Sequence, residues 1–137
     1  QRLFQFFPGT PQKLFLMAGI NDVSHDLSTD SVVSLITKVI EKIQTESPRT
    51  KLYIQSLLPI NESFGRYKTM TGKTDLIPEI NRKLEALAKE KKISFIHLFP
   101  LFTEKNSNVM RKELTTDGLH LTEEGYRIWS KALKRYL

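Results

Sequence analysis

KLFLMAG, at Lys13–Gly19, gives the clearest indication of the fold, because it is a continuous apolar run that ends in a glycine. Such a run is typical of a strand buried on both faces, as the strands of a parallel sheet are. Two later runs have the same character: LYIQSLL at Leu52–Leu58, which Pro59 closes, and ISFIHL at Ile93–Leu98. The sequence therefore predicts three strands.

Apolar residues recur at helical spacing in the segments between these strands. The first predicted helix follows Ser28 or Asp30, either of which is a candidate N-cap, and it ends before Pro48. The second spans Leu76–Lys91, where Pro78 fits only in the first turn. The expected buried positions of the two helices are Val32, Val33, Leu35, Ile36, Val39, Ile40 and Ile43, and Ile77, Ile80, Leu84, Leu87 and Ala88.

A third helix is predicted at the C-terminal end of the sequence. Thr122 is its expected N-cap, and Glu123 and Glu124 follow in the first turn, where negative charge favours the helix dipole. Its expected buried stripe consists of Tyr126, Trp129, Leu133 and Leu137.

The order of these elements predicts an open parallel α/β sheet. Right-handed crossovers place both connecting helices on one face of such a sheet. Only the C-terminal helix and Arg2–Phe7 are then left to cover the other face. Three strands with one half-covered face make a thin domain, so we expect further strands on its N-terminal side.

The composition is that of an ordinary globular domain, with 137 residues, 39% of them hydrophobic and 26% charged, and we expect residues 1–137 to form a single domain. The absence of cysteine excludes disulfides and thiolate metal sites. No apolar run approaches the about 20 residues of a transmembrane helix. Gln1–Pro11 has no signal-peptide pattern and no initiating methionine, so the sequence is expected to begin inside a longer gene product. A periplasmic or secreted location and a cytoplasmic one both stay open.

The net charge of +6 raises the question of an anionic partner. The basic residues are dispersed, mostly on the polar faces of predicted helices, and no aromatic residues are interleaved with them as in a single-strand binding platform. This pattern favours a solvated surface over a nucleic-acid site, and a polyanion-binding protein is the weakest of the functional hypotheses.

Two segments carry candidate chemistry. Asn21 follows the first strand, at the sheet edge where α/β proteins bind ligands, and its amide could stabilise an oxyanion or simply cap the turn. Asp117 lies three residues before His120, so its carboxylate could fix the imidazole tautomer and leave the other nitrogen as a general base. His97 belongs to a strand pattern, and the spacing of His25 with Asp22 and Asp26 matches no standard metal site, so no metal is expected.

Together, GIND at Gly19–Asp22 and DGLHLTEEGY at Asp117–Tyr126 resemble the third and fifth conserved blocks of the SGNH hydrolases, the GDSL lipase/esterase family. KLFLMAGIND and IQSLLPIN also resemble bacterial GDSL-like acylhydrolases and sialate O-acetylesterases. The resemblance implies a flavodoxin-like, three-layer α/β/α sandwich, of which this chain carries the last three strands and the C-terminal helix. It further implies hydrolysis of a small-molecule ester, an acyl or acetyl group on a carbohydrate or lipid, without a cofactor.

The same resemblance assigns roles to four residues. His120 corresponds to the general base of the family, Asp117 to the acid that orients it, and Asn21 to an oxyanion-hole donor, while Gly19 has a structural role in the turn. The nucleophilic serine of the family lies in a Gly-Asp-Ser motif after the first strand, and this sequence has no such motif. Neither Thr10 nor the serines Ser24, Ser56 and Ser63 have a nucleophile-elbow context. The nucleophile is therefore expected outside this sequence, and these 137 residues alone are expected to be inactive.

A second hypothesis treats the chain as a short homologue without catalysis that acts as a binding or self-association module. The strand at Lys13–Gly19 would then have an unpaired edge, and such edges pair with other chains. This hypothesis predicts a homodimer or a strand-swapped assembly.

Overall fold

The computed structural model describes residues 12–17 and 28–137 of the chain. They belong to two compact units. The sheet unit comprises Gln1–Leu57 and Glu79–Ile96, and the loop unit comprises Leu58–Pro78 and His97–Leu137.

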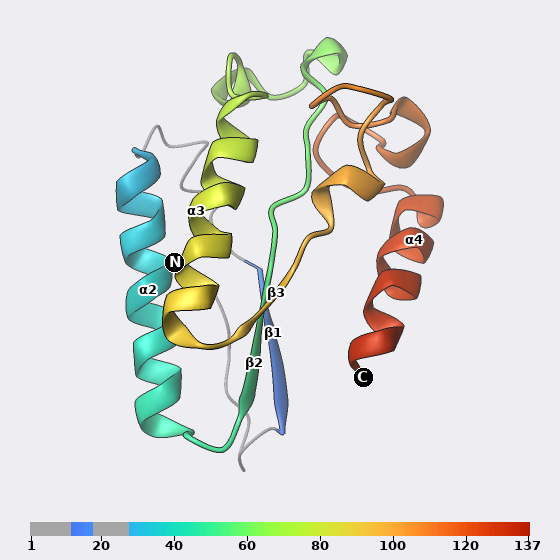
Figure 1. The fold of residues 1–137 in the computed structure, drawn as a ribbon. Helices are drawn as coiled ribbons and strands as arrows, with labels where there is room; N and C mark the ends of the chain where they lie inside the picture. The colour runs from blue at the N-terminus through green and yellow to red at the C-terminus, as the bar shows by residue number, and fades with distance from the viewer. Residues whose placement is uncertain (1–11, 18–27) are drawn as a thin grey trace. The chain divides into compact units, whose positions relative to one another are not determined.

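The sheet unit contains the predicted parallel sheet. Its described strands are β1 (Lys13–Leu16), β2 (Lys51–Gln55) and β3 (Ser94–Ile96), in the order β1-β2-β3 (Figure 1). Leu14 is paired with Leu52, and Ile54 with Phe95. In the central strand β2, every residue after the first is buried, which is the two-sided burial expected of a continuous apolar run. The prediction of an α/β fold with a parallel sheet is therefore confirmed.

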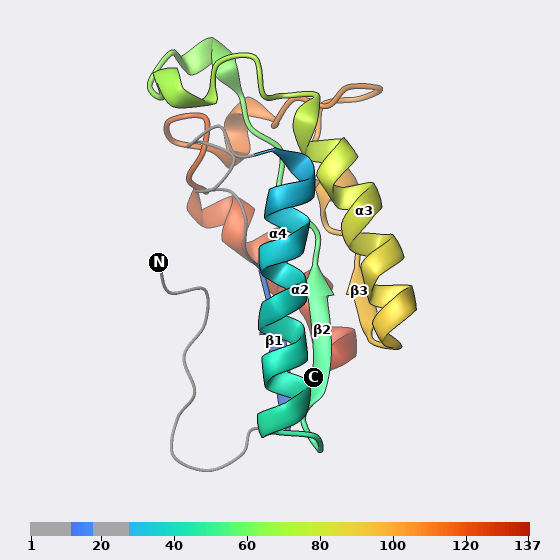
Figure 2. The same ribbon diagram turned by 90° about the vertical axis from the view of Figure 1, so that its left-hand side faces the viewer.

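Two helices cover one face of this sheet. The helices α2 (Thr29–Glu46) and α3 (Leu76–Lys91, of which the residues from Glu79 onward belong to the sheet unit) lie side by side on the same face, as Figures 1 and 2 show. This arrangement follows from two crossovers that run in the same direction across the sheet, and the order of the elements predicts it.

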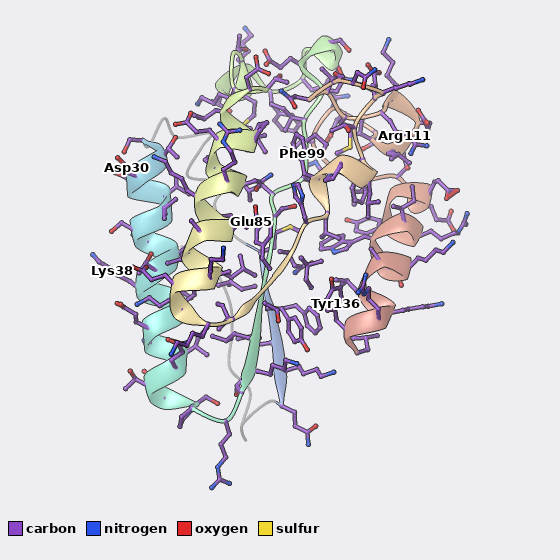
Figure 3. All side chains as sticks on the ribbon, viewed as in Figure 1. Asp30, Lys38, Glu85, Phe99, Arg111 and Tyr136 are labelled. Carbon is purple, nitrogen blue, oxygen red and sulfur yellow. The ribbon has the colours of Figure 1, made fainter. Side chains whose placement is uncertain are left out.

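The N-terminus of α2 resolves the choice between the two candidate caps. Ser28 is the N-cap, and its hydroxyl accepts a hydrogen bond from the backbone N–H of Ser31 at 3.1 Å. Asp30 instead forms an ion pair with Lys83 of α3 at 2.7 Å, and its side chain extends from the first turn of α2 in Figure 3.

The buried faces of both helices are aliphatic. Full burial of one such side chain contributes about 1.5–3 kcal/mol. All five positions predicted for α3 are buried, whereas in α2 the buried set is narrower than predicted and consists of Val32, Ile36, Ile40 and Ile43. Leu35 of α2 is exposed, since it lies about 100° around the helix from Ile36.

The loop unit contains little regular structure apart from one helix. Short 3₁₀ turns occur at Glu62–Phe64, Lys68–Met70, Phe99–Leu101, Lys112–Leu114 and Lys134–Tyr136. Isolated bridges join Ile60 to Val109, Thr103 to Met110 and Thr115 to Leu121. The core of this unit is formed by Ile60, Met70, Leu98, Phe99, Phe102, Met110 and Leu114.

The helix of the loop unit is α4 (Glu123–Leu133), and the Thr122 hydroxyl caps it by accepting the N–H of Gly125 at 3.2 Å. The predicted stripe of this helix is correct for Trp129 and Leu133 and wrong for Tyr126 and for Leu137, which lies beyond the end of the helix. Tyr126 is 54% exposed and Leu137 is 77% exposed. The less exposed face carries Gly125, Ile128, Trp129, Ala132 and Leu133.

Gly125 provides the physical reason for the exposure of Tyr126. It is buried, and a Cβ at this position would lie 2.8 Å from the carbonyl oxygen of Leu114. Because of this close approach, the Gly125 side of α4 faces inward and the adjacent Tyr126 faces outward. The pattern of apolar residues in the sequence does not predict this contact.

In the part of the chain that the structure describes, no helix combines the length and the hydrophobicity that crossing a membrane requires.

Candidate active site

The centre of the candidate site is the pair formed by Asp117 and His120. Nδ1 of His120 lies 2.8 Å from Oδ2 of Asp117. The other carboxylate oxygen, Oδ1, accepts the backbone N–H groups of Leu119 at 2.9 Å and His120 at 2.8 Å. The Asp117 side chain is 14% exposed and that of His120 is 63% exposed. The three-residue spacing thus folds into a tight turn that brings carboxylate and imidazole together, as the sequence predicts.

This geometry determines which imidazole nitrogen is free to act. A carboxylate can only accept a hydrogen bond, so Nδ1 of His120 carries the proton and Nε2 has an available lone pair. Such a nitrogen can take a proton from an attacking hydroxyl, and the neighbouring carboxylate stabilises the imidazolium that forms. Across the described residues, no hydrogen bond is made by Nε2.

Tyr67 is a third member of this group. Its hydroxyl donates to Oδ2 of Asp117 at 2.9 Å and lies 3.2 Å from Nδ1 of His120. No local pattern in the sequence links Tyr67 to Asp117, because 50 residues separate the two in the chain. An aromatic residue between two basic ones in a polar loop is the only available signal.

The hydrogen bonds alter the pKa values of Asp117 and Tyr67. Burial, the largest single influence, raises the pKa of Asp117. The hydrogen bonds from the backbone and ring of His120, from Leu119 and from Tyr67 together outweigh it and hold that pKa far below its ordinary value. The hydrogen bond to Asp117 raises the pKa of Tyr67, because deprotonation would place two negative charges side by side. Asp117 therefore stays ionised and Tyr67 stays a donor at neutral pH.

Gly118 lets the Asp117–His120 turn contact the segment after β2. Its φ is +95°, and a Cβ there would collide with the backbone carbonyl of Asn61. The Asn61 N–H donates to the Gly118 carbonyl at 2.8 Å. Only glycine adopts this φ easily and allows two backbones to approach so closely.

Thr115 closes the turn from the other side. Its hydroxyl donates to the His120 carbonyl at 2.6 Å and accepts the Gly118 N–H at 2.9 Å. Because Thr115 is buried, these hydrogen bonds are shielded from water and hold the turn in one conformation.

The segment that carries Tyr67 is held by Glu62. One carboxylate oxygen accepts the Gly72 N–H at 2.8 Å, and the other accepts the Thr74 N–H at 3.1 Å and the Thr74 hydroxyl. The hydroxyl of Thr74, followed by the N–H of Gly72, lowers the pKa of Glu62. Glu62 thus joins the two ends of the loop that presents Tyr67.

A pocket of about 140 Å³ lies between this loop and the Asp117–His120 turn. Its wall combines apolar, neutral polar and charged residues. They are Ile60, Asn61, Glu62, Gly65, Arg66, Tyr67, Lys68, Met70, Thr71, Asp117, Gly118 and Leu119. All of them belong to the loop unit.

The structure describes only some of the other candidate residues. Asn21 and Gly19 lie outside the described residues, as do Thr10, Ser24 and the His25, Asp22 and Asp26 group. His97 is exposed directly after β3, at a strand end. Ser56 is fully buried, and the Ser63 hydroxyl donates to Oδ1 of Asn61.

Comparison with protein families gives one match over most of the chain. The model of the GDSL-like lipase/acylhydrolase family matches residues 2–128. No curated protein is similar enough to count as a match.

Solved structures of bacterial proteins share the fold. One, from Streptococcus pneumonia and provisionally named a platelet activating factor, has 29% identity and a TM-score of 0.87, with 96% of this chain and 62% of that one covered. A GDSL-like lipase from Bacteroides thetaiotaomicron has 26% identity and a TM-score of 0.80, with 92% and 62% covered. An acetyl xylan esterase has 22% identity and a TM-score of 0.73, with 93% and 67% covered, which shows the fold alone. This chain therefore spans about 62% of the length of the first two structures.

Proposed function

Since this chain belongs to the GDSL-like lipase/acylhydrolase family, we propose that the protein hydrolyses carboxylic esters, with His120 as general base. The observation that carries this proposal is the 2.8 Å contact between Nδ1 of His120 and Oδ2 of Asp117. It engages one ring nitrogen and leaves Nε2 as the proton acceptor, which is the arrangement that serine hydrolases use.

The reaction would proceed by acyl transfer. A serine hydroxyl attacks the ester carbonyl while Nε2 of His120 accepts the serine proton, and the protonated imidazole then gives that proton to the leaving alcohol. Water, deprotonated by the same Nε2, next attacks the acyl group on the serine, and the imidazolium returns the proton to the serine oxygen as the carboxylic acid leaves. Asp117 keeps the imidazole in the correct tautomer and stabilises its positive charge. The amide of Asn21 would donate to the oxyanion of the tetrahedral intermediate.

The nucleophile in this proposal comes from sequence outside these 137 residues. Two facts support this: no serine of the chain has the expected context, and the chain spans about 62% of the length of its structural relatives. We propose an acyl or acetyl ester as substrate, and the acetyl xylan esterase of similar fold motivates an acetylated carbohydrate as one candidate.

Ester hydrolysis with and without the upstream sequence tests the proposal. The 137-residue chain should hydrolyse p-nitrophenyl acetate no faster than the uncatalysed background reaction. The protein translated from the complete reading frame should hydrolyse it, and His120→Ala should lower kcat by about 10²–10⁴-fold. His97→Asn, a change at another exposed histidine of the same chain, is the matched control and should leave kcat unchanged. Rapid turnover that survives His120→Ala would refute the assignment.

The alternative of a self-association module keeps one supporting observation. Among the described strands, β1 pairs with β2 only and lies at an edge of the sheet, and edge strands are templates for pairing between chains. Light scattering on the purified 137-residue chain separates the hypotheses, because the module predicts a stable dimer, whereas a monomer at high concentration contradicts it.

A further inference from the structure

We propose that the pocket between the Tyr67 loop and the Asp117–His120 turn is a subsite for an anionic group, a phosphate or a carboxylate. The group would belong to the part of the ester that does not react. The role in catalysis rests on the proposed function, whereas the binding of the anion itself does not.

Two cations line the pocket on either side of Tyr67. Arg66 and Lys68 are both exposed and both belong to its wall. Within the described part of the chain, neither side chain forms an ion pair or a hydrogen bond. Their charges are therefore available to a ligand, and an arginine fork is suited to bidentate contact with phosphate or carboxylate.

The two carboxylates of the same wall stay ionised, but among the described residues neither forms an ion pair with Arg66 or Lys68, because other donors already occupy their oxygens. Glu62 accepts the N–H groups of Gly72 and Thr74, and Asp117 accepts Tyr67, His120 and Leu119. The pocket wall thus combines two cations that have no ion-pair partner among the described residues with two carboxylates whose oxygens are occupied by other hydrogen-bond donors.

The dimensions and position of the pocket fit a subsite rather than a whole substrate site. Its volume of about 140 Å³ is below the roughly 300–1,000 Å³ of typical ligand pockets. The walls that are not charged include the side chains of Ile60, Met70 and Leu119. Tyr67 and Asp117 belong both to the pocket wall and to the hydrogen-bonded group of His120, so an anion held there would anchor a substrate beside the proposed general base.

Binding of inorganic phosphate to the 137-residue chain tests the subsite without any need for turnover. In an NMR titration at constant ionic strength, the amide signals of Arg66, Lys68 and Gly118 should shift in a saturable way. A charged hydrogen bond is worth about 1.5–3 kcal/mol, so Arg66→Gln and Lys68→Gln should each weaken binding about tenfold or more. Arg66→Lys should retain only part of the affinity, because the positive charge remains and the bidentate fork is lost.

Lys38→Gln is the matched control, since Lys38 is an exposed lysine on α2 (Figure 3). The proposal is overturned if phosphate shifts signals across the whole chain, or if Lys38→Gln weakens binding as much as Lys68→Gln. Phenyl phosphate and benzoate, titrated in the same way, distinguish a phosphate subsite from a carboxylate subsite.

Hydrolysis by the protein from the complete reading frame separates the subsite from the proposed function. Three acetate esters serve as substrates: 4-acetoxyphenyl phosphate, 4-acetoxybenzoate and the neutral 4-acetoxybenzamide. Arg66→Gln should raise KM about tenfold for an anionic ester and leave the neutral ester unchanged. If wild type and Arg66→Gln hydrolyse all three esters with equal KM values, the subsite is refuted and the proposed ester hydrolysis stands. If phosphate binds but none of the esters is hydrolysed, the proposed hydrolysis is refuted and the subsite stands.

Discussion

The phenol of Tyr67 and the carboxylate of Asp117, 50 residues apart in the sequence, are joined by a hydrogen bond of 2.9 Å. The acceptor is Oδ2, the same oxygen that lies 2.8 Å from Nδ1 of His120. One carboxylate oxygen therefore serves a phenol and an imidazole at once. This sharing links the loop that presents Tyr67 to the proposed general base, and the first predictions follow from it.

The tautomer of His120 should depend on Asp117. In the wild type we expect the Nδ1–H form, which ¹⁵N NMR of the histidine ring detects. Asp117→Asn should reduce the population of this form, because the amide can also donate to the ring and so favour the wrong tautomer. Glu104→Gln, at an exposed carboxylate elsewhere in the loop unit, should have no effect. An unchanged tautomer in Asp117→Asn would contradict the orienting role of Asp117.

Tyr67 should titrate above the ordinary tyrosine pKa of about 10. The hydrogen bond to Asp117 raises the pKa because it stabilises the protonated phenol. The difference in ultraviolet absorbance between wild type and Tyr67→Phe isolates this one phenol from the four tyrosines of the chain. Its midpoint should fall when the same comparison is made in an Asp117→Asn background, and a midpoint that does not move would disprove the coupling.

Asp117 should stabilise the fold at neutral pH and less so in acid. Its native pKa is lowered, so its contribution is complete above the unfolded value of about 3.9 and declines as the pH falls below that value. The difference in urea midpoint between wild type and Asp117→Asn should therefore narrow from about pH 7 to about pH 3. A gap that widens in acid would show that the pKa shift has the opposite sign.

Gly118→Ala should destabilise the Asp117–His120 turn. Forcing alanine to a positive φ costs about 1–3 kcal/mol, and the added methyl group also collides with the Asn61 carbonyl. Gly72→Ala is a matched control, because Gly72 also has a positive φ, of +80°, but a Cβ added there would have no atom within 4 Å. Urea unfolding should rank Gly118→Ala as clearly the more destabilising change, and equal effects would show that the contact with Asn61 is unimportant.

Glu62→Gln should loosen the loop that carries Tyr67. The carboxylate accepts the Gly72 and Thr74 N–H groups as a charged partner, and the neutral amide forms weaker hydrogen bonds. Limited proteolysis with trypsin should then cleave faster after Arg66 and Lys68, two exposed sites in this loop. Glu104→Gln should leave the cleavage rate unchanged. An unchanged rate of trypsin cleavage in Glu62→Gln would show that Glu62 does not hold the loop.

Much of the fold could be predicted because the signals were local. The caps Ser28 and Thr122 each form their hydrogen bond within three residues, and the bounds of α3 follow from a continuous helical pattern. The exposure of Tyr126 on α4 could not be predicted in this way. It depends on the contact of Gly125 with the Leu114 carbonyl, whereas the large ring of Tyr126 suggested a buried position.

The order of strands and helices along the chain and the pairing of Asp117 with His120 could be predicted, because each depends on residues that are neighbours in the sequence. That Tyr67 joins this pair, and that Arg66 and Lys68 line a pocket with Asp117, became visible only in the folded chain. The reason is that the backbone contact between Asn61 and Gly118 brings two distant segments together, and no local pattern of side chains encodes that contact.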